Sequence, residues 1–418
     1  MRKKQLRAVI ITSLIISILF SGCGTSNNLS VTDNSEKNSK TEATTATEDE
    51  NLSTESATEK TTEATTTEEL TEEENTTEDT SGESFSDTLD ITTEDGVASA
   101  SFYAFDTYTS VTAYGEDAEA ALRSSADMID SMNSKLNSTQ VGTEIYKLNE
   151  AGESSDCSED LKNVISEGID YYKETNGALN FALYPLSVAW GFRNTGDFRV
   201  PSDEEITELL QLAEPEKIDL SDGVRYEKDG MKTDLFYISK GYTSDKVSEM
   251  LCSDYTDGLS GALITLGGNV TAIGSKPDGK PWKVGIQNPD GESGSYIAVV
   301  SLNLEAGSSL SVCSDGIYED SFEQDGTVYH HLIDPETGYP ADSGIVSATA
   351  ISEDASLADA FASASVVMGY DKAIELWKTS SRDFNLILVD INGTIYVTEG
   401  MAENVSSSTN QIQIISKN

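Results

Sequence analysis

Histidine is almost absent from this chain of 418 residues, which contains two, His330 and His331, side by side. Histidine has the ordinary side-chain pKa nearest to neutral pH, so it is the usual proton carrier in catalysis. Acid–base chemistry that depends on histidine must therefore occur at this pair. Residues 334–340, shortly after the pair, are rich in turn formers, which predicts a strand end that leads into a rigid loop. An ordinary surface pair is the alternative interpretation.

Cysteine is also scarce. The chain has Cys23, Cys157, Cys252 and Cys313, with no Cys-x-x-Cys pair among them. The last three are isolated and odd in number, which argues against a disulfide framework or a zinc site. We expect these three to be small buried hydrophobic residues.

Positively charged residues are also few. The chain has 27 Lys and Arg residues and 73 Asp and Glu residues, which gives a formal net charge of -46. Proteins bind phosphate backbones through Lys and Arg, so this balance argues against nucleic acid as a partner. Between residues 41 and 80, Lys60 is the one basic residue. The segment from Cys23 to Asp95 is rich in Thr, Ser and Glu and poor in large apolar side chains. We expect it to be a disordered acidic tether, because it cannot offset its conformational entropy by burial.

The N-terminus has the pattern of an export signal. Basic residues at positions 2, 3, 4 and 7 precede an apolar run over residues 8–20, followed by Ser21, Gly22 and Cys23. This predicts a signal peptide over residues 1–22, and its end resembles the lipobox of bacterial lipoproteins, which implies a lipid on Cys23. A retained transmembrane anchor is the alternative. Either way, we expect the rest of the chain on the extracytoplasmic face of a bacterial cell membrane.

The residues from 97 to 418 suffice for one large domain or two fused subdomains. Alternation predicts a hairpin over 100–115, and apolar residues at helical spacing predict helices over 117–137, 158–173 and 357–368. Ser202 and Glu205 form a capping-box pattern at a helix start. Strands are expected at 262–266, 282–286, 296–304 and 345–351, and an Asn392-Gly393 turn between 384–391 and 394–398. The irregular order of strands and helices favours an α+β fold over a doubly wound one.

One segment imitates a phosphate-binding loop. Residues Gly274 to Lys280 nearly match the P-loop pattern, but Pro281 stands where the pattern needs a hydroxyl, so we interpret the segment as a hairpin turn. The sequence also lacks the Gly-x-Gly-x-x-Gly and Gly-x-Ser-x-Gly patterns. Neither a dinucleotide fingerprint nor a hydrolase nucleophile elbow is therefore indicated.

A carboxylate and a hydroxyl stand four residues apart on the helix expected over 357–368. Asp359 and Ser363 would share one face of it, and two oxygen donors on one face can hold a hard cation such as Mg²⁺. The spacing by itself fits an ordinary pair on a helix surface equally well.

Several short motifs follow one another in a fixed order. They are Phe105-Asp106-Thr107, Thr143–Asn149, Asn176–Asn180, Trp190–Phe192, Asp234–Asp245, Ala262–Asn269, Pro281–Pro289, His331–Gly338 and Ala358–Ala360. This ordered set resembles the ApbE family, the FAD:protein FMN transferases, and covers the chain from Ser101 to about Thr398.

The resemblance implies an α+β, T-fold-related domain over residues 97–418, with two subdomains, mixed sheets and flanking helices. It implies that FAD binds between the subdomains with Mg²⁺ on its diphosphate. It also implies transfer of FMN from FAD to a Thr or Ser hydroxyl of a partner protein, with release of AMP. The implied partner is an acceptor flavoprotein of an extracytoplasmic electron-transfer system.

The resemblance also implies roles for single residues. Asp359, Ser363 and the backbone carbonyl of Tyr237 match the metal ligands, and His331 matches the histidine implicated in catalysis. His331 is a suitable base for a hydroxyl nucleophile, whereas His330 would point the other way along a strand. The positions that match FAD contacts are Asp234, Lys240, Ala178, Leu179, Asn180, Phe105, Thr139 and Leu332.

The chain departs from the family pattern at several of these positions. Asn180 stands where the family usually has Asp, and Ser363 replaces Thr. Phe236 and Tyr237 replace a small pair and crowd the nucleotide or metal entrance, and residues 138–140 lack the aromatic often seen against the flavin. These departures leave two alternatives open, a magnesium-dependent FAD pyrophosphatase and a non-catalytic flavin-binding lipoprotein.

Overall fold

The computed structural model describes residues 84–193, 196–291, 294–408 and 410–418. The expected signal peptide, Cys23 and most of the expected tether lie outside the described residues. Contacts among the described residues, from 84 onward, hold their elements together as one unit. In the described part of the chain, no helix is both long and apolar enough to cross a membrane.

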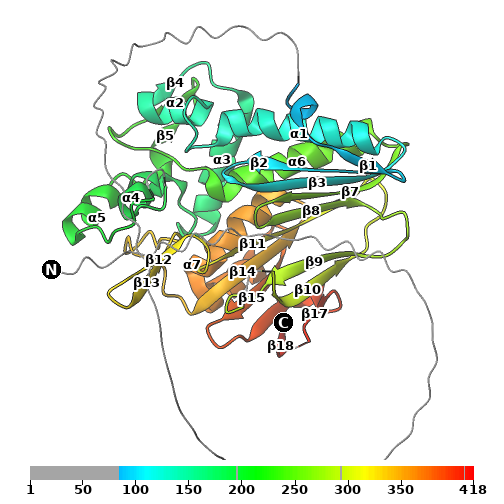
Figure 1. Cartoon of the computed structure of the whole chain (residues 1–418). Helices are drawn as coiled ribbons and strands as arrows, with labels where there is room; N and C mark the ends of the chain where they lie inside the picture. Colours follow the sequence, from blue (N-terminus) through cyan, green and yellow to red (C-terminus); the bar gives the residue numbers. More distant parts are fainter. Residues whose placement is uncertain (1–83, 194–195, 292–293, 409) are drawn as a thin grey trace, which may run out of the picture. The chain divides into compact units, whose positions relative to one another are not determined.

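The centre of the fold is a ten-stranded sheet with the order β1-β2-β3-β7-β8-β11-β14-β15-β16-β18 (Figure 1). Neighbouring strands are antiparallel except for the parallel pair β16 and β18. The strands are β1 Thr92–Glu94, β2 Val97–Ala104, β3 Thr107–Gly115, β7 Leu259–Leu266, β8 Asn269–Gly274, β11 Ser309–Gly316, β14 Ile345–Ser352, β15 Asn385–Asp390, β16 Ile395–Thr398 and β18 Ile412–Ile415.

Helices cover one face of this sheet. They are α1 Ala118–Leu136, α6 Phe236–Asp254 and α7 Ala355–Thr379, and Figure 1 shows α1 and α6 running along β2, β3 and β7. Helix α3 Glu159–Glu174 packs on α1, α6 and α7. Alternate residues of the strands, such as Ala350 and Leu388, join the helices in the largest hydrophobic cluster. Successive side chains of a strand point to opposite faces of the sheet, so each strand also has side chains on the face away from the helices.

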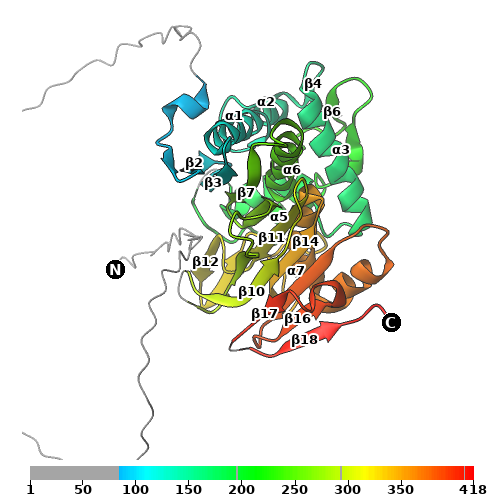
Figure 2. The same cartoon turned by 90° about the vertical axis from the view of Figure 1, so that its right-hand side faces the viewer.

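The other face of the sheet packs against a three-stranded sheet, β17-β10-β9 (Figure 2). Its strands are β9 Trp282–Gln287, β10 Tyr296–Leu302 and β17 Val405–Ser406. Trp282 and Val300 meet Ile351 and Ile387 of the main sheet in a second hydrophobic cluster. The α+β prediction is therefore confirmed.

A third hydrophobic cluster holds the segment that carries the histidines. Trp190, Phe192 and Ile206 pack there with Ile333, two residues beyond His331. The elements around it are α4 Tyr184–Trp190, α5 Asp203–Leu210 and the hairpin of β12 Ser321–Gln324 with β13 Thr327–His330. The remaining elements are α2 Glu144–Ala151 and the small sheet of β4 Glu153–Ser154, β6 Val224–Tyr226 and β5 Ile218–Asp219.

The ordered fold begins earlier than residue 97, so the tether prediction is wrong for its last residues. A 3-10 helix spans Phe85–Thr88, and β1 pairs with β2. The ring of Phe85 packs edge-on against Phe102 at 5.3 Å between centroids, and the amide of Ser86 donates to Asp127 Oδ1 at 2.7 Å. Isolated apolar residues within an acidic segment are enough to attach it to the core.

One other local prediction needs correction. The segment Gly274–Lys280 is not a hairpin, because β8 and β9 belong to different sheets and the segment crosses between them. The capping-box prediction, by contrast, is supported, because the Ser202 hydroxyl accepts the amide of Glu205 at the start of α5. The Glu205 carboxylate pairs with Arg199.

The three cysteines inside the described part of the chain are free thiols. Cys313 is buried in the central strand β11, as expected. Cys157 and Cys252 are only partly buried, so the prediction of buried residues is wrong for these two.

Candidate active site

Two clefts flank the first turn of α6 and contain most of the predicted site residues. The first has a free volume of about 20 Å³ and is lined by residues that include Ala178, Leu179, Asn180, Tyr237, His331, Leu332 and Ser363. The second has a volume of about 350 Å³ and is lined by residues that include Phe105, Ser138, Thr139, Arg193, Asp234 and Phe236. The first cleft holds no more than about one water molecule, so a nucleotide enters it only if side chains move.

His331 is the first residue after β13, and it is 1% exposed. Its Nδ1 lies 3.3 Å from the carbonyl oxygen of Glu319, and its Nε2 lies 3.3 Å from Oδ1 of Asp315. Burial lowers the pKa of His331, but the Asp315 carboxylate outweighs burial and raises it above the ordinary value. Nδ1 is thus within hydrogen-bond distance of a carbonyl, whereas Nε2 is buried without a hydrogen-bond partner and meets Asp315 only at ion-pair distance.

His330 has a different environment, although it is also buried. Its Nε2 faces the carbonyl oxygen of Ala341 at 3.1 Å, and its Nδ1 is buried without a hydrogen-bond partner. Burial, aided by the charge of His331, lowers the pKa of His330 to about 4. The surface-pair interpretation is therefore wrong for both histidines.

Asp315, near the end of β11, is a site residue that the sequence analysis missed. Its Oδ2 accepts a hydrogen bond from the hydroxyl of Ser363 at 2.6 Å, so it contacts both a predicted metal ligand and the predicted catalytic histidine. Burial pushes the pKa of Asp315 upward, but His331 and Ser363 outweigh it and the pKa is lowered. The available signal was a carboxylate in a strand whose preceding residues, Val312 and Cys313, are buried.

Asp359 lies in the second turn of α7, facing α6. Its Oδ2 accepts the backbone N–H of Gly241 at 2.9 Å, and its Oδ1 lies 3.8 Å from Nζ of Lys240. A side chain at Gly241 would collide with the carbonyl of Ala355, so glycine permits this close crossing of the two helices. Burial raises the pKa of Asp359 despite the nearby lysine.

These residues fit a magnesium site that uses few protein ligands. An α-helix directs the Gly241 N–H toward the carbonyl of Tyr237, so Asp359 lies beside the carbonyl that the resemblance implies as a ligand. Within the described residues, no three His, Cys, Asp or Glu side chains gather as a metal cluster. Mg²⁺ in nucleotide sites is commonly held by one or two carboxylates, with phosphate and water oxygens as the other ligands. The oxygen donors of Asp359, Ser363 and the Tyr237 carbonyl match that chemistry.

The second cleft contains a buried ion pair that sequence reasoning also missed. Arg193 Nε donates to Asp234 Oδ2 at 2.7 Å, while Asp234 Oδ1 accepts from the hydroxyl of Ser138 at 2.6 Å. The guanidinium of Arg193 lies 4.1 Å from the centre of the Phe236 ring, and Nζ of Lys240 lies 3.7 Å from it. Two cations are thus held near one aromatic ring. Arg193 directly follows the Trp190–Phe192 motif, which was the available signal.

Two of the predicted flavin contacts, Asn180 and Thr139, already have hydrogen-bond partners within the protein. Asn180 donates to the carbonyl of Ala213 at 2.9 Å and accepts the amide of Ala182 at 3.0 Å. An ionised aspartate could not make the first bond, which explains Asn at this position. The hydroxyl of Thr139 bonds to Asp106 and Asn137, beside the turn that contains Phe105.

Tyr237 explains why the first cleft is narrow. Its ring stacks on that of His331 with 6.1 Å between centroids and an interplanar angle of 11°, and its hydroxyl donates to the carbonyl of His331 at 3.1 Å. Phe236 meets the same imidazole edge-on. Tyr237 lines the first cleft, and Phe236 lines the second.

The chain is similar to known proteins of one family. The sequence model of the ApbE family matches residues 105–388, more than half of the chain. The FAD:protein FMN transferase of Treponema pallidum is 32% identical over 234 residues, which cover 52% of this chain and 62% of that protein. The FAD:protein FMN transferase of Klebsiella pneumoniae is 31% identical over 245 residues, which cover 57% of this chain and 72% of that protein.

Solved structures share the fold. The ApbE protein of Thermotoga maritima is 27% identical, with a TM-score of 0.65, and the match covers 76% of this chain and 99% of that one. The flavin transferase ApbE of Vibrio cholerae matches with a TM-score of 0.62 at 22% identity, covering 74% of this chain and 99% of that one.

Proposed function

Because this chain belongs to the ApbE family, we propose that it transfers FMN from FAD to a Thr or Ser hydroxyl of a partner protein, releases AMP and requires Mg²⁺. One observation carries the proposal: the residues predicted for FAD, for metal and for catalysis line two clefts on either side of the start of α6, or lie beside them. FAD is an elongated dinucleotide with a ring system at each end. Two clefts on either side of one helix turn, with two cations held at the Phe236 ring of the second, suit such a ligand.

Different residues would bind the diphosphate of FAD and hold the Mg²⁺ that neutralises its charge. Lys240 and Arg193 would supply positive charge toward the diphosphate. Asp359, Ser363 and the Tyr237 carbonyl would hold Mg²⁺, which supplies neutralisation of the charge that develops on the phosphate oxygens. Tyr237 must turn away from His331 to admit the nucleotide, because its ring closes the narrower cleft.

The transfer step is a substitution at the phosphorus of the FMN half. The acceptor hydroxyl oxygen forms a bond to that phosphorus, and the bond to the bridging oxygen breaks, so AMP leaves with the electron pair. The hydroxyl loses its proton, and His331 is the candidate that takes it. A ring nitrogen must first be deprotonated: Nδ1 faces the carbonyl oxygen of Glu319, and Nε2 lies 3.3 Å from Asp315 Oδ1 without a hydrogen bond.

The location of the protein is part of the proposal. The basic and apolar pattern of residues 1–22, followed by Cys23, supports a lipid anchor on the extracytoplasmic face of a bacterial cell membrane. An electron-transfer flavoprotein on that face is the proposed acceptor. Cys23→Ser should abolish incorporation of radiolabelled fatty acid in cells, and continued labelling of that variant would refute lipidation at Cys23.

The proposed activity is tested by incubating the full chain with FAD, Mg²⁺ and an acceptor protein that carries the family's Ser-Gly-Ala-Thr motif. We expect a fluorescent band and a flavin mass on the acceptor, together with AMP. An acceptor with Val in place of the motif's Thr, and a reaction with EDTA, are the controls. AMP and FMN without an adduct would indicate an FAD pyrophosphatase, and bound FAD without turnover would indicate a flavin-binding lipoprotein.

A further inference from the structure

Asp315 joins side chains that come from distant parts of the chain. Its Oδ2 accepts from the Ser363 hydroxyl, 48 residues away, at 2.6 Å, and its Oδ1 lies 3.3 Å from Nε2 of His331. The backbone N–H of Gly316 also donates to Oδ1, at 2.8 Å. All three side chains are buried. The carboxylate therefore ties the end of β11 to the segment after β13 and to α7.

We infer that Asp315 is a positioning residue that holds the imidazole of His331 and the hydroxyl of Ser363 in one fixed arrangement. This inference rests on the proposed transfer of FMN and assigns a role to a residue that need not touch FAD or the acceptor. The Ser363 hydroxyl donates to Oδ2 and the Gly316 amide donates to Oδ1, so the carboxylate cannot rotate freely, and Oδ1 is held facing Nε2 of His331. Reactions that depend on such alignment lose about 100-fold in rate from displacements near 1 Å.

A carboxylate is the group that this position requires. Ser363 donates a hydrogen bond to one oxygen of Asp315, and Nε2 of His331 faces the other oxygen at ion-pair distance, so each of the two groups needs an oxygen on its own side. Asn offers one acceptor oxygen and one NH₂, and Ala offers neither. Asp315→Ala should therefore release both partners, and Asp315→Asn should release one.

The kinetic test compares Asp315→Ala and Asp315→Asn with Ser314→Ala in the full chain. The hydroxyl of Ser314 lies on the same strand but pairs with Thr349 at 2.8 Å, so this variant controls for a lost hydrogen bond in β11. For Asp315→Ala we expect kcat to fall by about 100-fold with a much smaller change in KM for FAD. Asp315→Asn should show a smaller loss of kcat, and Ser314→Ala should match the parent protein.

A double variant tests whether Asp315 acts through the histidine. If it does, Asp315→Ala combined with His331→Ala should be little worse than His331→Ala alone, because residues that act as a unit are not additive. Multiplied losses in the double variant would overturn the inference. So would an unchanged kcat in folded Asp315→Ala or, should that variant not fold, in Asp315→Asn.

A second readout needs no activity, because the chain has two histidines and one serves as an internal control. In the nitrogen NMR spectrum of the ligand-free protein, at one fixed pH, Asp315→Ala should move the Nε2 signal of His331. The His330 signal, whose Nε2 faces Ala341, should stay in place. An unmoved His331 signal would overturn this inference alone, whereas a parent protein that never forms the flavin adduct would overturn the proposed function.

Discussion

Arg193 Nε and Asp234 Oδ2 form an ion pair at 2.7 Å in which the side chains are 6% and 5% exposed. The same carboxylate accepts the hydroxyl of Ser138 and the amide of Phe236. Asp234 is thus fully engaged before any ligand binds, and Arg193 is the charge that makes its burial tolerable. Asp234, which is expected to contact flavin, therefore also connects Arg193, Ser138 and Phe236 in the wall of the second cleft.

Removal of the Arg193 guanidinium should show how strongly the buried Asp234 carboxylate depends on its counter-charge. In Arg193→Ala the Asp234 carboxylate stays buried without its counter-charge, so we expect the free energy of unfolding to fall by about 3–5 kcal/mol. Arg199→Ala is the matched control, since its pair with Glu205 is solvent-exposed and should contribute no more than about 1 kcal/mol. Urea unfolding of the three proteins measures both values. Equal losses in the two variants would contradict the assignment of a buried pair.

His331→Ala should separate chemistry from binding. Loss of the proton acceptor should lower the rate of FMN transfer by about 100- to 10,000-fold and leave FAD affinity largely intact. His330→Gln retains a donor toward the carbonyl of Ala341 and should keep most of the activity. Transfer assays with FAD titrated by fluorescence measure both properties. A His331→Ala variant as active as the parent would remove this residue from the mechanism.

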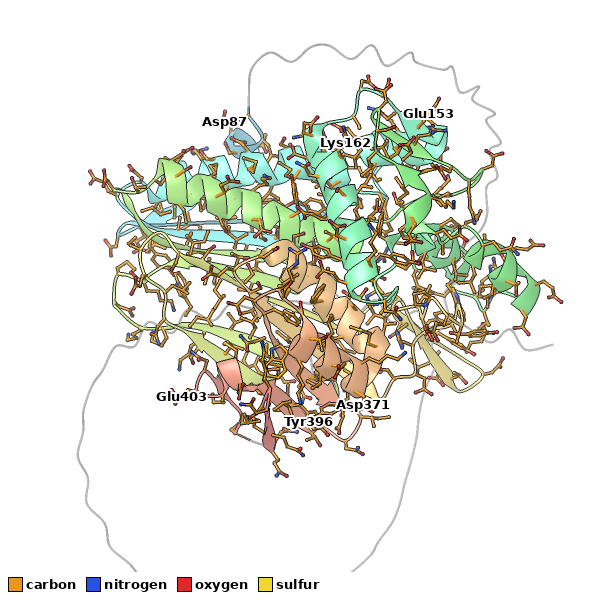
Figure 3. The ribbon with its side chains drawn as sticks, turned by 180° about the vertical axis from the view of Figure 1, so that it is seen from behind. Asp87, Glu153, Lys162, Asp371, Tyr396 and Glu403 are labelled. Atoms are coloured by element: carbon orange, nitrogen blue, oxygen red, sulfur yellow. The ribbon has the colours of Figure 1, made fainter. Side chains whose placement is uncertain are left out.

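Asp359→Ala should remove the response to magnesium. Asp359 is the predicted carboxylate ligand, so turnover should fall to the level that the parent protein shows in EDTA, and calorimetry should no longer detect Mg²⁺ binding in the presence of FAD. Asp371→Ala changes an exposed carboxylate on the same helix, labelled in Figure 3, and should retain the parent's magnesium dependence. Unaltered magnesium dependence in Asp359→Ala would refute the metal assignment.

His330 should make the fold sensitive to acid. Its pKa is lowered from 6.5 in the unfolded chain to about 4 in the folded protein, so between these values the unfolded state binds more protons. The stability that this residue contributes is present above pH 6.5 and is lost as the pH falls toward 4, by up to about 3 kcal/mol. In His330→Gln, urea unfolding at a series of pH values should show a shallower decline over this window. An equally steep decline would assign the acid sensitivity to other groups.

The sequence by itself determined the local structure and the inventory of chemical groups. Apolar periodicity located α1, α3 and the β2–β3 hairpin, because burial of one face dictates that spacing. The order of short motifs identified the ApbE resemblance, and most of the implied residues do line the two clefts. The histidine pair, being unique in the chain, indicated where acid–base chemistry would be found.

Only the tertiary structure decided which groups meet. Asp315 reaches Ser363 across 48 residues and Arg193 reaches Asp234 across 41, and no periodicity or spacing encodes contacts at such separations. The same packing made two adjacent histidines unlike, since one faces a carboxylate and the other a carbonyl. The same packing attaches residues 84–95 to the fold, because the ring of Phe85 packs against the ring of Phe102. Burial and partners set the pKa, rigidity and strength of each group, and these follow from the arrangement of elements in space.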